Sequence, residues 1–246
     1  MIPLKLSKFQ IIVVLGISVA GGTVFAQTLA PTDNSIDNLV EFNTDEGKNL
    51  LLKSKSTEDF FPLTMQFVTQ DNQAYCGVAS IVMVLNSLGI PAPESPQFKP
   101  YRIFTQENFF SNQAAVKVIS PDVVSRQGMT LQELGKLLES YQVKTQVYHA
   151  GNTSLEEFRK LATDNLRQSD NFIIVNYLRK AIGQKRGGHI SPLAAYNKET
   201  DRFLILDVSR YKYPPVWVKT EDLWKAMNTA DSTAGKTRGF VLVSKN

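Results

Sequence analysis

The sequence predicts an α+β protein, in which a helix-rich first half is followed by a half rich in short strands. In the first half, apolar residues recur at helical spacing after Cys76, and capping-box patterns begin at Thr130 and Ser154. In the second half, runs rich in β-branched and aromatic residues, such as Phe172–Tyr177, alternate with turn residues. No linker-like segment separates the halves, so we expect one domain.

Residues 1–26 have the pattern of a secretory signal peptide. Two lysines precede the apolar run Ile11–Val19, and Val24-Phe25-Ala26 offers small residues at a cleavage site. We therefore expect export, to the periplasm, and no stable membrane association once the signal is cleaved. The alternative is an uncleaved membrane anchor over Phe9–Ala26, which is about long enough to span a bilayer.

The remaining elements follow in chain order. The polar residues 27–43 predict a flexible leader, and residues 44–246 predict the folded domain. Helices are expected over Asn43–Ser54 with Thr44 as its cap, from Cys76 to a C-terminal cap at Gly89, over Gln106–Ala115, and after Thr130 and Ser154. Strands are expected at Val143–His149, Phe172–Tyr177, Gly188–Tyr196, Phe203–Val208 and Phe240–Val243.

Composition argues against two classes of partner. The formal net charge is +4, and without residues 1–26 it falls to +2, which is too weak to indicate nucleic-acid binding. The chain has one cysteine and two histidines, with no CxxC or HExxH pattern, so we expect no protein-bound metal site.

The lone cysteine, Cys76, is the first candidate for chemistry. It stands where the predicted helix begins, and there the unpaired backbone N–H groups and the helix dipole favour a thiolate. In an exported protein a single cysteine forms no intramolecular disulfide, which leaves chemistry as a reason for its presence. The alternative is a small, buried apolar residue within a hydrophobic helix.

Gln70 precedes Cys76 by six residues, across a polar turn. That turn allows the chain to fold back, so that the Gln70 amide lies near the sulfur. A nucleophile at a helix start beside an amide donor provides an attacking group and a partner for the oxyanion, which are the requirements of acyl transfer.

His189 and Asp207 are the expected partners of the thiol. If residues 197–201 form a five-residue hairpin loop, the register places Asp207 opposite Ser191 and makes His189 its diagonal neighbour on the same face. A four-residue loop would put the two side chains on opposite faces. An acid inside the apolar run that contains Asp207 costs free energy unless it is paired, so it is expected to orient the imidazole.

With these residues in place, the sequence resembles the catalytic domain of phytochelatin synthases over about residues 44–246. The resemblance rests on four segments in the same order: TQDNQAYCGVASIVMVLNSLGI, GGHISPLAAYN, LILDVSRYKYPPVWV and AGKTRGF. It implies a papain-like cysteine-protease fold, in which the helix-rich half carries Cys76 and an antiparallel sheet carries His189 and Asp207. Eukaryotic members have a second, cysteine-rich domain; this chain ends at Asn246 and so resembles the short bacterial type.

The resemblance also implies roles for individual residues. Cys76 is the expected nucleophile, His189 the acid/base, Asp207 its orienter, and Gln70 the oxyanion donor. The expected substrate-binding residues are Asn176, Arg179, Gly188, Arg210, Tyr213, Asp231 and Arg238. An Asp231–Arg238 pair suits the γ-glutamyl end of glutathione, which carries an ammonium and a carboxylate.

The resemblance implies acyl transfer on glutathione. The expected reaction cleaves the Cys–Gly bond through a thioester and gives γ-glutamylcysteine and glycine, with weaker transpeptidation to phytochelatin. Hydrolysis should need no cofactor, heavy-metal ions such as cadmium should stimulate transpeptidation, and a homodimer is also considered. Two alternatives are a papain-like peptidase that acts on larger peptides and a non-catalytic periplasmic protein that binds thiols or soft metals.

Overall fold

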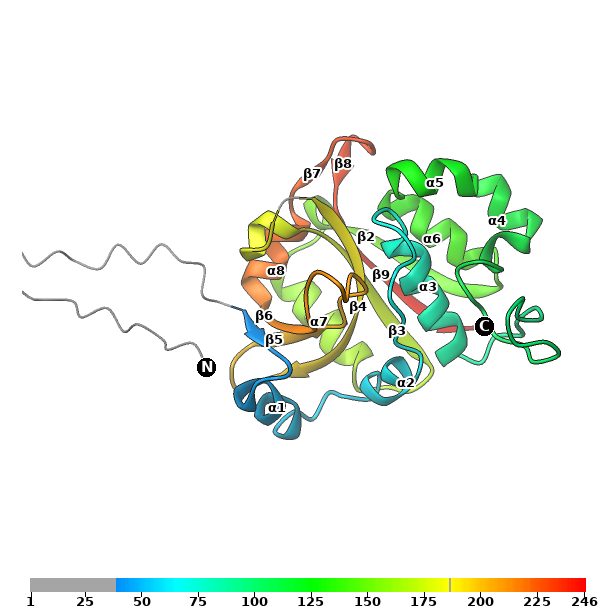
Figure 1. The fold of residues 1–246 in the computed structure, drawn as a ribbon. Coiled ribbons are helices and arrows are strands. Elements are labelled where there is room, and N and C mark those ends of the chain that lie inside the picture. The colour runs from blue at the N-terminus through cyan, green and yellow to red at the C-terminus, as the bar shows by residue number, and fades with distance from the viewer. Residues whose placement is uncertain (1–38, 186) are drawn as a thin grey trace, which may run out of the picture. The chain divides into compact units, whose positions relative to one another are not determined.

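The computed structural model describes residues 39–185 and 187–246 (Figure 1). The predicted signal peptide and the leader up to residue 38 therefore lie outside the described residues. Val40–Glu41, near the end of the expected leader, form strand β1. Among the described residues, no helix combines the length and the apolar character that crossing a membrane requires.

A seven-stranded sheet forms the centre of the described part, in the order β1-β6-β5-β4-β3-β9-β2, and each neighbouring pair is antiparallel. A separate hairpin pairs β7 with β8. Besides β1, the strands are β2 Val143–His149, β3 Asn171–Leu178, β4 Gly188–Asn197, β5 Arg202–Ile205, β6 Val216–Lys219, β7 Ala230–Asp231, β8 Lys236–Thr237 and β9 Gly239–Lys245.

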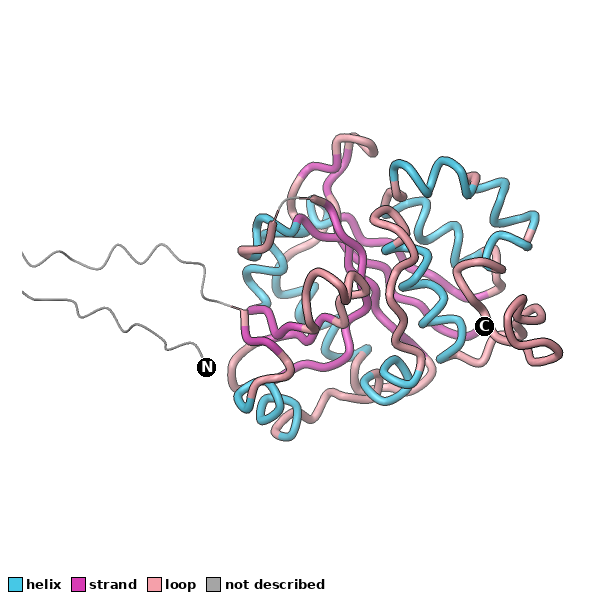
Figure 2. The backbone as a smooth tube through the Cα atoms, viewed as in Figure 1, coloured by secondary structure: helices cyan, strands magenta, loops and turns pink. Residues whose placement is uncertain are grey.

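Helices cover both faces of this sheet (Figure 2). On one face α3 packs on β4, and α6 packs on β2 and β9; on the other face α7 and α8 pack on β3. The α-helices are α1 Asp45–Leu52, α2 Phe60–Met65, α3 Cys76–Ser87, α4 Gln113–Val118, α5 Pro121–Gln127, α6 Leu131–Glu139, α7 Leu155–Asn165 and α8 Thr220–Met227. Short 3₁₀ turns are η1 Phe109–Ser111, η2 Ala150–Asn152 and η3 Arg179–Ile182.

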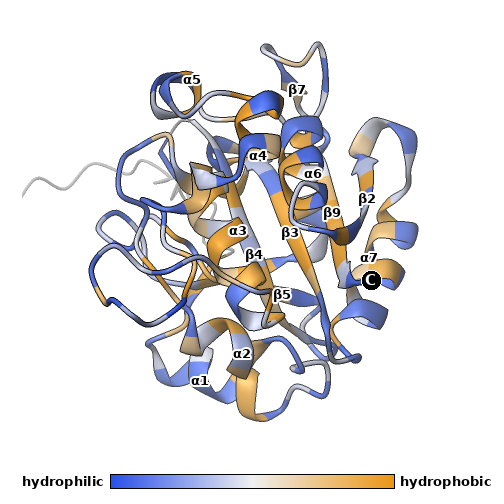
Figure 3. Cartoon of the chain, turned by 90° about the vertical axis from the view of Figure 1, so that its right-hand side faces the viewer, coloured by the Kyte–Doolittle hydropathy of each residue, from blue (hydrophilic) through white to orange (hydrophobic). Residues whose placement is uncertain are grey.

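Strand β3 shows why the sheet needs helices on both faces. Its residues are apolar almost without interruption, which is typical of a strand buried on both sides. Phe172 and Ile174 belong to the core under α3 and α6, whereas Ile173 and Val175 belong to the core under α7 and α8. Figure 3 shows hydrophobic residues along α3 and β3, at the centre of the molecule.

Most predicted elements occur, with three differences. The expected helix over Gln106–Ala115 is replaced by η1 and the later helix α4. The expected strand Phe203–Val208 ends at Ile205, so that Asp207 follows the strand instead of lying in it. Helices α2, α5 and α8 and strands β1, β6, β7 and β8 were not anticipated.

The hairpin loop between β4 and β5 also differs from the expectation. Asn197 pairs with Arg202, so the loop has four residues, 198–201, where five were expected. A β-bulge then shifts the register between Leu193 and Ala195 and adds one residue to β4, after which Leu193 pairs with Ile205. This is the register that the five-residue loop would have given, and so the bulge compensates for the shorter loop.

Candidate active site

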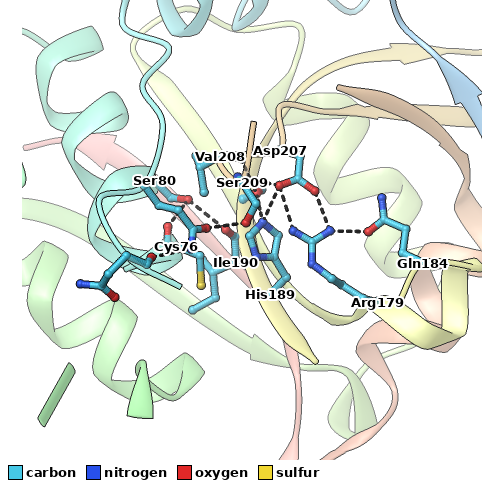
Figure 4. A network of polar contacts seen from close by, with 12 residues as sticks. Cys76, Ser80, Arg179, Gln184, His189, Ile190, Asp207, Val208 and Ser209 are labelled. Carbon is cyan, nitrogen blue, oxygen red and sulfur yellow. Dashed lines mark hydrogen bonds and ion pairs between the residues drawn. The ribbon is translucent and has the colours of Figure 1, made fainter. Parts of the chain in front are cut away.

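Cys76 is the first residue of α3, as the sequence predicts, with Tyr75 as the capping residue. Its side chain is 9 % exposed. Ser80, one turn later, donates from its hydroxyl to the Cys76 carbonyl at 2.8 Å and lies 3.2 Å from the carbonyl oxygen of Ile190 in β4. The first turn of α3 is therefore fixed against the strand that carries His189 (Figure 4).

His189 lies near the start of β4 and joins Cys76 to Asp207. Its Nε2 is 2.8 Å from Asp207 Oδ1 and 3.0 Å from Ser191 Oγ. Its other ring nitrogen is thereby left to act on the Cys76 thiol, whose pKa His189 lowers. The structure thus brings together the three residues that the sequence predicts as a triad, and both members of the His189–Asp207 pair are buried.

Asp207 has more partners than the sequence suggested. Arg179 binds it through two parallel hydrogen bonds, NH1 to Oδ2 at 2.7 Å and NH2 to Oδ1 at 2.9 Å. The backbone N–H of Ser209 also donates to Oδ1, at 2.8 Å. Arg179 in turn donates to Gln184 Oε1. The buried carboxylate is therefore compensated by two cationic partners and a backbone donor, which its complete burial requires.

These contacts set the pKa of each group. Burial favours the neutral thiol of Cys76, but the hydrogen bond and charge of His189, with the backbone N–H groups of Ile190 and Gly77, outweigh burial and lower the Cys76 pKa. Burial alone would lower the pKa of His189, yet Asp207 and Cys76 raise it. His189 and Arg179 hold the pKa of Asp207 well below its usual range despite burial. The arrangement favours a thiolate–imidazolium pair.

Gln70 lies beside this network and is oriented by it. Its Oε1 accepts a hydrogen bond from the Ser209 hydroxyl at 2.6 Å, and its Nε2 donates to the carbonyl of Asn72 at 2.6 Å. The amide nitrogen has two N–H groups, so one is left for another acceptor. Because Ser209 also binds Asp207, one residue connects the predicted oxyanion donor with the acid of the triad.

Cys76 and His189 line a cavity of about 480 Å³, which lies within the range of ~300–1,000 Å³ for small-ligand sites. One wall comes from α5 and the loop after it, including Arg126 and Met129. The other wall comes from the ends of β3 and β4 and from the β7–β8 hairpin, which Figure 1 shows on the other side of the start of α3 from α5. Charged side chains on both walls suit a small ligand that carries charges of its own.

The structure divides the predicted substrate-binding residues into two groups. Four of them line the cavity: Asn176, Gly188, Asp231 and Arg238. The other three lie outside its lining. Arg179 is behind the triad on Asp207, Arg210 lies over the ring of Phe67, and Tyr213 lies beneath the Arg179 guanidinium and accepts a hydrogen bond from the Lys185 N–H.

Sequence reasoning did not identify Arg126, Met129, Ser191 and Ser209. Met129 lies so close to Gly77 that a side chain at that glycine would meet its sulfur at 2.5 Å. For Ser191 and Ser209 the sequence offered one indication of a role, since each lies two residues from a predicted member of the triad. Arg126 and Met129 lie more than 45 residues from the nearest predicted catalytic residue in the sequence, and no motif marks them.

Comparisons with known proteins place this geometry in context. Residues 33–240 match the family model for phytochelatin synthase. The chain is similar to glutathione gamma-glutamylcysteinyltransferase 1 of Triticum aestivum, at 38 % identity over 84 % of this chain and 40 % of the relative. It is also similar to glutathione gamma-glutamylcysteinyltransferase 1 of Lotus japonicus, at 36 % identity over 84 % of this chain and 40 % of the relative.

A fungal relative agrees with the two plant proteins. The glutathione gamma-glutamylcysteinyltransferase of Schizosaccharomyces pombe is 29 % identical over 82 % of this chain and 48 % of its own length. The chain therefore spans less than half the length of the curated relatives that it matches.

Proposed function

Because the chain belongs to the phytochelatin synthase family, we propose that it is a glutathione γ-glutamylcysteinyltransferase with a papain-like arrangement of Cys76, His189 and Asp207. The observation that carries the proposal is the meeting of these three side chains at a cavity with charged walls. Cysteine supplies the nucleophile, histidine the proton transfer, and the acid the orientation of the imidazole.

The first chemical step forms a thioester. The Cys76 thiolate attacks the carbonyl carbon of the bond between cysteine and glycine in glutathione. The negative charge that develops on the carbonyl oxygen is stabilised by the free N–H of the Gln70 amide and by the backbone N–H of Cys76. As the C–N bond breaks, the His189 imidazolium donates its proton to the nitrogen of the leaving glycine.

The second step transfers the γ-glutamylcysteinyl group. Neutral His189 takes a proton from water, whose oxygen attacks the thioester and releases γ-glutamylcysteine and the Cys76 thiolate. Alternatively, His189 takes a proton from the amino group of a second glutathione, whose nitrogen attacks the thioester; the C–S bond breaks, the Cys76 thiolate leaves, and the product is longer by one γ-glutamylcysteine unit. Both branches use the same acyl-enzyme, so the acceptor decides between hydrolysis and transpeptidation.

The γ-glutamyl end of the substrate is assigned to Asp231 and Arg238. Both residues line the same wall of the cavity. The Asp231 carboxylate can therefore bind the ammonium group of the substrate, and the Arg238 guanidinium can bind the α-carboxylate of the substrate. The Arg238 guanidinium is held at NH1 by Thr229 Oγ1 at 3.1 Å and by the Ala230 carbonyl at 2.5 Å. Asn176 and Gly188 complete this wall. For Arg179, Arg210 and Tyr213, substrate contact remains a prediction.

No step of this mechanism is assigned to a protein-bound metal. The described residues contain no group of three or more His, Cys, Asp or Glu side chains that could hold one. Stimulation of transpeptidation by cadmium stays part of the proposal, as do export to the periplasm through residues 1–26 and a homodimer.

Mass spectrometry of the protein with glutathione, with and without cadmium, tests the proposal. We expect one γ-glutamylcysteinyl group on Cys76, together with free glycine and γ-glutamylcysteine, and longer chains chiefly with cadmium. Cys76→Ser is nearly isosteric and should fold but release no glycine. Unmodified Cys76 and intact glutathione would refute the proposal and favour larger peptide substrates or a binding role. Glycine release by Cys76→Ser would refute the nucleophile.

A further inference from the structure

The proposed function leaves one charged end of glutathione without a partner. Glutathione carries a carboxylate on its glycine as well as the charges of its γ-glutamyl end. If Asp231 and Arg238 bind the γ-glutamyl end, the glycine extends from the reacting carbonyl toward the opposite wall, because acyl and leaving groups lie on opposite sides of that carbon. A carboxylate in a partly desolvated cleft needs a cationic or hydrogen-bonding partner.

We propose that Arg126 on α5 binds the glycine carboxylate of glutathione and thereby selects substrates with a free C-terminal carboxylate. Among the described residues that line the cavity, the arginines are Arg126 and Arg238, and no lysine is present. They belong to opposite walls: Arg238 accompanies the β7–β8 hairpin, and Arg126 accompanies Gln127 and Met129. Figure 1 shows the start of α3, which carries Cys76, between α5 and this hairpin.

The side chain of Arg126 has one carboxylate partner on its own helix. Asp122, one turn earlier on α5, accepts from NH1 of Arg126 at 2.6 Å and from NH2 at 2.5 Å. This pair occupies one edge of the guanidinium and leaves the Nε–NH2 edge with donors for a second carboxylate. Both side chains are more than 60 % exposed, so the pair itself is weak and does not withdraw Arg126 from a ligand.

A carboxylate-binding subsite at this position explains a selectivity for substrate length that the triad alone does not provide. The triad can attack many amide bonds, whereas a cation in the same cavity as Cys76, on the wall toward which the leaving group extends, favours a substrate that ends one residue after the scissile bond. The inference rests on the proposed function, because it assumes that glutathione is bound with its γ-glutamyl end at Asp231 and Arg238.

The test compares glutathione with its C-terminal amide, γ-Glu-Cys-Gly-NH₂. Both give γ-glutamylcysteine, so one assay gives kcat/KM for each. With the unchanged protein we expect a preference of about tenfold for the free acid, the value of a partly exposed charge-assisted contact. Arg126→Gln should lose this preference, mainly through a higher KM for glutathione, and should cleave the amide as the unchanged protein does. Arg126→Lys should keep part of it.

Lys117→Gln is the matched control, because it removes an exposed cation of the neighbouring helix α4 that does not line the cavity. It should leave the preference unchanged. Hydrolysis of the preformed acyl-enzyme should also be unchanged in Arg126→Gln, because glycine has already left. A preference that persists in Arg126→Gln, or no preference in the unchanged protein, would overturn the inference and leave the proposed function standing. No γ-glutamylcysteine from either substrate would overturn the proposed function itself.

Discussion

Replacing Ser209 by alanine tests whether the orientation of Gln70 controls the rate of acylation. The Ser209 hydroxyl is the donor to Gln70 Oε1, at 2.6 Å, and both side chains are at most 4 % exposed. Ser209→Ala leaves this buried acceptor unpaired, which costs about 1–3 kcal/mol. The amide can relieve that cost by rotating, and rotation moves its N–H away from the oxyanion.

The size of the effect is bounded by the value of the donor itself. Loss of one oxyanion-hole donor costs about 10²–10³ in kcat, so Gln70→Ala sets the upper limit. We expect Ser209→Ala to slow thioester formation by about tenfold to a hundredfold, with KM little changed. Ser209→Thr retains the hydroxyl and should remain near the unchanged rate. The assay is single-turnover release of glycine from glutathione.

A double variant distinguishes positioning from general damage. If Ser209 acts only through Gln70, adding Ser209→Ala to Gln70→Ala should slow acylation no further. The pH dependence of Cys76 alkylation should be unchanged, because the Ser209 backbone N–H that binds Asp207 is retained. Equal slowing by Ser209→Ala in the presence and absence of Gln70 would refute the reasoning, as would an unchanged rate in the single variant.

Three further predictions concern the charges of the site. Arg179→Met leaves the buried Asp207 carboxylate with one cationic partner fewer, so the free energy of unfolding, measured in urea, should fall by about 3–5 kcal/mol. The decrease should be smaller for Arg179→Lys. An unchanged free energy of unfolding in Arg179→Met would contradict a structural role for this ion pair. The folded-state pKa of Cys76 is lowered and that of His189 is raised, so iodoacetamide should alkylate Cys76 rapidly at a pH below the usual pKa of a thiol. Asp207→Asn should narrow the pH profile of the acylation rate, because the alkaline limb of that profile moves to lower pH. Alkylation of Cys76 with the pH dependence of an ordinary thiol would exclude the thiolate–imidazolium pair. Because the pKa of Asp207 is lowered on folding, its contacts stabilise the folded state at pH values above the unfolded-state pKa of ~3.9. This contribution is lost as the pH falls through the folded-state pKa. Acid unfolding of Asp207→Asn, compared with acid unfolding of the unchanged protein, measures it.

Sequence alone predicted the central elements because their signals are local. The Thr130 capping box forms as expected, and the strand predicted at Val143–His149 has the observed bounds. Helix α3 begins at Cys76, and Gly89 adopts the positive φ of +62° that a helix C-terminus favours. In each case the deciding residues lie within a few positions of one another.

Features that depend on distant contacts were not predictable in this way. The approach of His189 to Asp207 was expected from a five-residue loop, but it is produced by a four-residue loop and a bulge in β4. The extra residue, Ala194, is neither glycine nor proline, and Pro192, one position before Leu193, is the single local sign that the ladder is interrupted there. The expectation for the two side chains was right, although the structural reason given for it was wrong.

Asp207 shows how far one physical rule extends. Burial of an acid requires compensation, and this rule alone predicts a cationic partner. It does not say that there are two, Arg179 as well as His189, because both partners depend on how β3, β4 and β5 come together. With Arg179 present, the thiolate, imidazolium, carboxylate and guanidinium form a neutral set of four. If the imidazolium gives up its proton to the leaving glycine, the thiolate has by then become a neutral thioester, and the remaining carboxylate and guanidinium still balance. We infer that Arg179 keeps this buried site electrically neutral before and after acylation.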